Sequence, residues 1–227
     1  VIRGFHTELE AVYEEYNIGL TSDWRKMYAA LFAKLFPTHP YGTQTTIGLG
    51  EHLKNPSITN IKNYFNKYYV PNNVAICLSG DLNPDETVAI IEKYFGNWKP
   101  SAHIDVPQFP AQPALTAPVD TTVIGKEATT FFMGWRADAG KSLQMDTLEI
   151  VAQLLSNGQA GLFDLNLNQK LKVQEVGAGV ADMDEYSVFY IYGQPKSGQT
   201  LQEARALALS EIEKLKKGEF SDYLLPS

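Results

Sequence analysis

The sequence has few of the residues that most often form covalent cross-links or metal sites. Cys77 is the single cysteine, so neither an internal disulfide nor a zinc site made of several thiolates can form within the chain. The four histidines stand at positions 6, 39, 52 and 103, and no two of them are three or four residues apart. A pair of histidine metal ligands on one helix is therefore excluded within these 227 residues.

Long hydrophobic runs and positive charge are also scarce. No apolar run approaches the ~20 residues that a transmembrane helix needs, so we expect no membrane span in this sequence. The net charge is −7, whereas a nucleic-acid-binding surface normally carries an excess of basic residues, so we expect no nucleic-acid partner. The chain opens on Val1 without a signal-peptide pattern, and we interpret it as a fragment of a longer protein.

Hydrophobic periodicity predicts an α+β protein made of two blocks. One helix is expected from the acidic stretch around Leu9 to Tyr16, ending before an interruption at 17–22. Further helices are expected at 22–35, 57–68, 83–96, 142–155, 162–171 and 201–216. Strands are expected at 74–79, 121–137, 176–182 and 186–192, with a hairpin turn at 183–185.

A proline-rich stretch separates the two blocks. Five prolines lie within residues 99–118, and this stretch shows no helical period. Proline fixes φ and removes a backbone donor, so the stretch can neither extend a helix nor serve as a central strand. We therefore predict a connector at 99–118 between two domains.

The acidic helix near the start of the sequence is the one candidate functional cluster. Glu8 and Glu15 are seven residues apart, close to two helical turns, so their side chains share one helix face. Two carboxylates on one face repel each other, and a divalent metal ion with its other ligands would offset their negative charge. The simpler interpretation is that Glu8, Glu10, Glu14 and Glu15 form a solvated face. His39, between two prolines in a turn, is interpreted as a structural or surface residue.

These residues resemble a known family in an ordered series of segments. The run Glu8 to Glu15 is similar to a helix of the pitrilysin/insulinase type of zinc metallopeptidase, which includes mitochondrial-processing-peptidase-like bacterial zinc proteases. The resemblance covers nearly the whole chain, and the further matching segments are 23–25, 39–42, 43–50, 61–69, 70–73, 74–81 and 95–98.

The resemblance implies a zinc site that this chain would complete only in part. In the family an inverted His-x-x-Glu-His motif supplies two histidine ligands and a glutamate base. Carried over by position, Glu15 is the third zinc ligand and Glu8 is the glutamate that supports a histidine ligand. A one-residue shift would make Glu14 the ligand instead. The histidine motif is absent, so the fragment is expected to be inactive and to bind no catalytic zinc.

The resemblance also implies a domain map and a function for the longer protein. Residues 1–98 would be the C-terminal half of a catalytic domain, 99–118 a proline-rich linker, and 119–227 the N-terminal half of a second, non-catalytic domain of similar fold. The fold would be α+β, with sheets packed by helices. The longer protein would be a zinc-dependent endopeptidase acting on peptides or unfolded segments, with the remaining domains of its chain as partners. Exported bacterial relatives suggest the periplasm or cell envelope.

Two other interpretations stay open at this point. One is a non-catalytic scaffold or partner subunit that keeps the fold but has lost the site. The other is an unrelated α+β interaction domain, which would make the ordered match accidental. The sequence preceding residue 1 discriminates between the first two, because His-x-x-Glu-His there indicates a peptidase.

Overall fold

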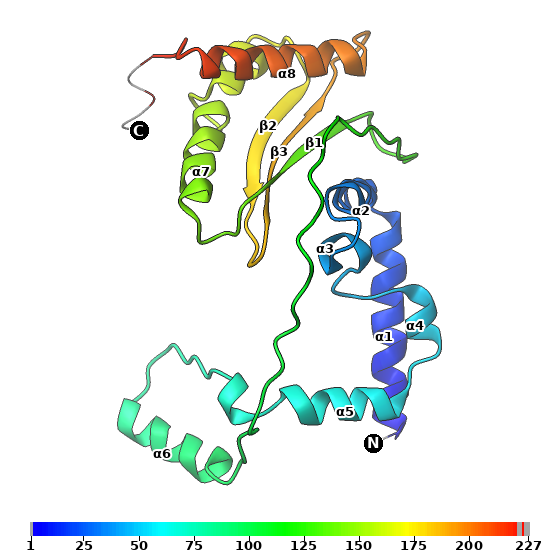
Figure 1. Cartoon of the computed structure of the whole chain (residues 1–227), viewed down its shortest axis with the longest axis vertical. Coiled ribbons are helices and arrows are strands. Elements are labelled where there is room, and N and C mark those ends of the chain that lie inside the picture. Colours follow the sequence, from blue (N-terminus) through cyan, green and yellow to red (C-terminus); the bar gives the residue numbers. More distant parts are fainter. Residues whose placement is uncertain (1, 222–223, 225–227) are drawn as a thin grey trace. The chain divides into compact units, whose positions relative to one another are not determined.

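The computed structural model describes residues 2–221 and 224, and it divides into two compact units. The first unit contains the N-terminal residues through Tyr13 together with Gly48–Ala111, and the second contains Glu14–Ile47 together with Gln112–Ser227. Figure 1 labels the main elements along the chain. No helix among the described residues is long and apolar enough to cross a membrane.

Helices make up all the regular structure of the first half of the described chain. They are α1 (Ile2–Thr21), α2 (Asp23–Leu35), α3 (Pro40–Thr43), α4 (Gly50–Lys54), α5 (Ile58–Tyr68), the 3₁₀ turn η1 (Pro71–Asn73) and α6 (Pro84–Phe95). Ser22, Ser57 and Asn83 cap α2, α5 and α6 through side-chain oxygens that accept backbone N–H bonds, as their sequence positions predict. The expected interruption at 17–22 was wrong for most of its length, because α1 continues to Thr21.

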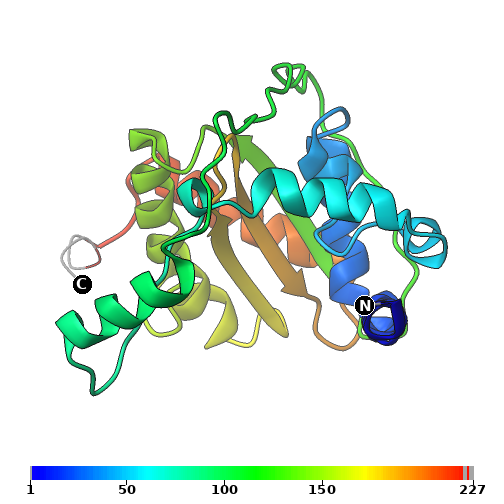
Figure 2. The same cartoon turned by 90° about the horizontal axis from the view of Figure 1, so that it is seen from below.

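The second half adds a small antiparallel sheet. The elements of the second half are β1 (Phe131–Ala137), α7 (Leu143–Leu155), the π-helical turn η2 (Asp164–Asn168), β2 (Glu175–Ala181), β3 (Ser187–Gln194) and α8 (Leu201–Lys216). The strand order is β1-β3-β2, and Figure 2 shows the three strands side by side. The predicted hairpin of β2 and β3 is confirmed, with Val180 opposite Phe189.

Each face of this sheet is covered by helices. On one face, Phe131, Phe189 and Ile191 pack with residues of α7 and α8 in the larger core, which includes Leu155 and Ala208. Side chains alternate between faces along a strand, so Val188 and Tyr190 belong to the opposite face. There they pack with Phe32, Leu35 and Phe36 of α2 and its C-terminus. The expected α+β class, with a sheet packed by helices, is confirmed.

Two expected strands and one expected helix differ from the structure. Residues 74–79 form no strand; Val74, Ile76 and Leu78 are exposed, and a strand needs a hydrogen-bonded neighbour that no described residue supplies. The strand expected at 121–137 covers only Phe131–Ala137. The backbone N–H groups of Lys126 and Glu127 donate to the side chain of Asp23 and not to a neighbouring strand. The helix expected at 162–171 is mostly the shorter π-helical turn η2.

No helix or strand lies within residues 96–130 of the described chain. In the first unit, α5 and α6 leave apolar side chains such as Ile61, Phe65 and Tyr94 exposed. The compact unit that contains the sheet also contains Glu14–Ile47. The expected division into one domain at 1–98 and a second domain at 119–227 stays a prediction.

Candidate functional site

The two predicted metal-site glutamates lie on the helix α1. Leu9, Val12, Tyr13 and Tyr16, the apolar stripe of this helix, are half-buried. Glu8 and Glu15 are exposed, and so is Glu14. The helix therefore presents its carboxylates to solvent, as both the metal-ligand interpretation and the solvated-face interpretation require.

The described residues do not complete a zinc site around Glu15. They contain no group of three or more histidine, cysteine, aspartate or glutamate side chains that could hold a metal ion. A catalytic zinc needs three protein ligands and an open position, and Glu15 offers one carboxylate. The donor set of the described residues therefore does not fit a whole zinc centre.

His39 has a structural role in the second unit, in agreement with the sequence interpretation. Its side chain is 1% exposed and caps α3, where Nδ1 accepts the backbone N–H of Tyr41 at 3.2 Å. Because Nδ1 accepts, Nε2 carries the proton and donates to the Glu185 carboxylate at 3.0 Å. Tyr41 Oη in turn accepts from the backbone N–H of Glu185. The imidazole thus ties the segment after α2 to the tip of the β2–β3 hairpin.

Arg136 on β1 makes a second link between the same segments. Its guanidinium donates to the backbone carbonyls of Leu35 and Pro113 and lies over the rings of Phe36 and Tyr186. One planar guanidinium group therefore donates hydrogen bonds to two carbonyl oxygens that belong to different segments of the chain. Nothing in the sequence marks this residue, because an arginine in a strand carries no specific signal.

Asp23, the first residue of α2, is a buried carboxylate. It accepts backbone N–H bonds from Glu127 at 2.7 Å and Lys126 at 2.5 Å, and an ammonium bond from Lys26 at 3.1 Å. The Glu127 N–H bond in particular, with help from Lys26, lowers the pKa of Asp23 against the opposing effect of burial. The ionised carboxylate therefore fixes the turn before β1 onto α2.

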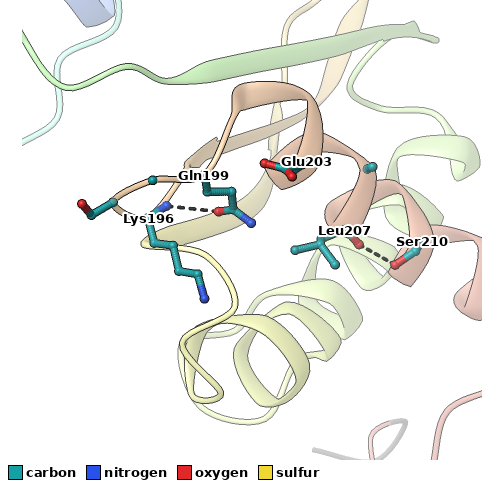
Figure 3. A pocket seen from close by; sticks show the side chains of 8 residues that line it. Lys196, Gln199, Glu203, Leu207 and Ser210 are labelled. Carbon is teal, nitrogen blue, oxygen red and sulfur yellow. Dashed lines mark hydrogen bonds between the residues drawn. The ribbon is translucent and has the colours of Figure 1, made fainter.

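A hollow of about 530 Å³ lies at the start of α8 (Figure 3). Its polar side chains serve the local turn: Glu203 completes a capping box with Thr200, and Gln199 accepts the backbone N–H of Lys196. Lys196 Nζ donates to the carbonyl of Leu171. The polar groups that line the hollow therefore form hydrogen bonds within the loop and at the start of the helix.

Comparison with known proteins gives the family. Residues 57–226 match a family model described as "Peptidase M16 inactive domain". The zinc protease PqqE of Helicobacter pylori is 25% identical over 205 residues, which are 86% of this chain and 45% of that protein. The chain thus spans about half the length of this relative.

Solved structures share the fold. A protease from Helicobacter pylori matches with a TM-score of 0.79 at 23% identity, over 98% of this chain and 55% of that chain. The periplasmic protease PqqL from Escherichia coli matches with a TM-score of 0.68 at 14% identity, over 97% of this chain and 25% of that chain. The resemblance noted in the sequence is therefore confirmed at the level of the family. The chain belongs to the M16 peptidase family, as a member that matches its inactive domain.

Proposed function

We propose that this chain is part of a zinc-dependent endopeptidase that hydrolyses peptides or unfolded segments. The observation that carries the proposal is the pair of exposed glutamates on α1 in a chain of the M16 family. The named relatives are a zinc protease and a periplasmic protease, which supports the activity and, more weakly, a periplasmic location.

Within the longer protein, Glu15 would be a carboxylate ligand to zinc, and Glu8 would orient a histidine ligand. A zinc ion held there would supply Lewis-acid activation for peptide-bond hydrolysis. The His-x-x-Glu-His motif and the remaining domains come from outside these 227 residues. Residues 1–98 then complete a catalytic domain, and residues 119–227 begin a non-catalytic one after the linker 99–118.

Peptide substrates follow from the peptidase family. One solved structure of the same fold is a ferredoxin protease in complex with Arabidopsis ferredoxin, and this complex supports a protein or peptide substrate for the present chain as well. For this chain we propose peptides or unstructured segments, because an extended backbone is the form in which a peptide bond is accessible to attack.

Substitution in the longer protein tests the proposal. Glu15→Gln replaces a carboxylate with a neutral amide, a poorer zinc ligand, and we expect it to lower bound zinc and to remove most hydrolysis of an unstructured peptide. Glu14→Gln is the matched control and should change little. Greater sensitivity at Glu14 would place the ligand one residue earlier. Full zinc content and activity in both variants would refute the metal site.

The alternative function is a non-catalytic partner subunit of the same fold. It is favoured by the match of residues 57–226 to an inactive domain. It predicts that the longer protein lacks His-x-x-Glu-His and that purified protein hydrolyses no peptide at any zinc concentration.

A further inference from the structure

The turn between α7 and η2 contains Asn157 followed by Gly158, the one Asn-Gly pair in the sequence. An asparagine side chain can react with the backbone nitrogen of the next residue, and a glycine there places no side chain in the way. Gly158 has a φ of +82°, and a β-carbon built on it would meet no atom within 4 Å. Both residues are exposed, so water reaches the pair. The pair is therefore sterically open to this reaction.

The carbonyl oxygen of the Asn157 side chain is held by two backbone donors. Its Oδ1 accepts the N–H of Gln159 at 3.0 Å and the N–H of Ala160 at 2.8 Å. Two such donors withdraw electron density from Cγ, and they stabilise the negative charge that the oxygen gains when a nucleophile adds to this carbon. The turn thus favours attack at Asn157 Cγ.

A buried carboxylate lies at the nitrogen that attacks. Asp164, the first residue of η2, is 6% exposed, and its Oδ2 accepts the N–H of Gly158 at 3.0 Å. This distance lies within the roughly 2.6–3.2 Å over which a general base takes a proton. The same oxygen accepts the N–H groups of Asn157 at 2.9 Å and Gly161 at 3.2 Å, so several bonds fix its position. A nucleophile, a base and donors to the developing negative charge therefore meet in one turn.

We propose that Asn157 is a self-modification site, at which the Gly158 nitrogen attacks Asn157 Cγ and the side-chain amide leaves as ammonia. The Gly158 N–H proton passes to Asp164 as the bond between nitrogen and Cγ forms. Asp164 then gives this proton to the departing amide group, so the carboxylate is regenerated and a cyclic imide remains. Water opens the ring: cleavage at Cγ leaves aspartate at position 157, and cleavage at the main-chain carbonyl leaves isoaspartate.

The modification changes the charge of the turn. Either product places a second carboxylate close to the buried carboxylate of Asp164, and isoaspartate also lengthens the main chain by one carbon atom. Like charges at short range repel each other, so the turn should loosen next to Leu162 and Phe163, which belong to the larger core. This inference does not depend on peptidase activity, and the site uses neither Glu8 nor Glu15.

Peptide mapping of the 227-residue chain tests the site. The chain is incubated at neutral pH, either folded or unfolded in guanidinium chloride, and digests taken over time are analysed by mass spectrometry for conversion of Asn157 to aspartate or isoaspartate. We expect conversion about tenfold faster in the folded chain, below the roughly 100-fold or more that a positioned base contributes in enzymes. The physical reason is that Asp164 and the two N–H donors surround the pair in the folded chain alone.

A variant and an internal control isolate the role of the base. Asp164→Asn keeps the size and an acceptor oxygen but removes the base, so it should slow conversion in the folded chain by about tenfold and leave the unfolded chain unchanged. Asn72 is the control within each digest. The backbone N–H that follows it, that of Asn73, donates to the carbonyl of Val70, so its proton is held by a carbonyl and not by a carboxylate. Asn72 should stay unmodified over the same period.

Three results would overturn the proposal. They are conversion of Asn157 in the folded chain no faster than in the unfolded chain, an unchanged rate in folded Asp164→Asn, and equal conversion at Asn72. If circular dichroism shows that Asp164→Asn is misfolded, the comparison of the folded with the unfolded unchanged chain decides the proposal by itself.

Discussion

Asp23 and Gly125 lie so close that a β-carbon on Gly125 would overlap the Asp23 carboxylate. The missing side chain lets the backbone at Lys126 and Glu127 reach that carboxylate with both N–H groups. A residue at the start of a helix thereby determines the path of a segment about a hundred residues later in the chain.

Substitution at either position should lower the melting temperature. Asp23→Asn keeps the size but removes the charge that strengthens the two N–H bonds, and Gly125→Ala introduces the overlapping β-carbon. We expect a loss of several degrees for each, measured by thermal denaturation. Gly158→Ala tests a glycine with positive φ but open space, so it isolates backbone strain from steric overlap. Unchanged melting of Gly125→Ala would show that the turn moves freely away from Asp23.

The Asp23 contact also predicts a pH dependence of stability. Its pKa is lower in the folded chain than the ordinary value of 3.8, so folding favours the ionised form. The stabilisation is complete above that ordinary value and is lost as the pH falls through it towards the lowered pKa. Denaturant unfolding between pH 6 and pH 2.5 should therefore show a smaller acid-induced loss in Asp23→Asn than in the unchanged chain. Equal losses would contradict the assignment.

His39→Ala should destabilise the chain by about 2 kcal/mol, because it removes a helix cap and leaves a cavity. His39→Asn keeps a capping side chain but loses the bond to Glu185, so its loss should be smaller. Urea unfolding compares the two. Equal losses would assign the whole effect to the contact with Glu185.

Asn168 is expected to stabilise the outer edge of β2. Its side-chain amide donates to the carbonyl of Val176 and accepts the N–H of the same residue, replacing a neighbouring strand at that position. Asn168→Ala leaves both backbone groups without a partner and should cost about 2 kcal/mol in urea unfolding. Gln169→Ala removes an exposed bond to the Gln159 carbonyl and is the control, with a loss below about 0.5 kcal/mol.

The chain by itself should bind zinc weakly and hydrolyse no peptide. The described residues bring no group of three metal-binding side chains together, and Glu15 supplies a single carboxylate. Calorimetric titration with zinc should show no site of micromolar or better affinity, and Glu15→Gln should give the same result. Tight stoichiometric binding that disappears in Glu15→Gln would show that this chain holds more of the site than we describe.

Local signals in the sequence predicted where four of the helices begin. Ser22, Ser57, Asn83 and Ser142 each cap a helix within one residue of the expected start, because a capping side chain acts on backbone groups two or three residues away. Gly125 lies in the part of the expected strand 121–137 that does not form a strand in the structure.

Candidate sites were harder to predict. The heptad spacing of Glu8 and Glu15 places them on one side of α1, but exposure alone does not separate a metal ligand from a solvated face.

The sequence by itself determined the α+β class, the helix starts, the β2–β3 hairpin and, through its ordered segments, the family. These depend on periodicity and on contacts within a few residues. The tertiary structure decided which apolar runs became strands and which polar groups came together. Residues 74–79 have strand composition but no neighbour, whereas Phe131–Ala137 pair with β3, and Asp23 meets Lys126 and Glu127. A strand and a buried carboxylate are stable only with partners, and the position of a distant partner is set by packing.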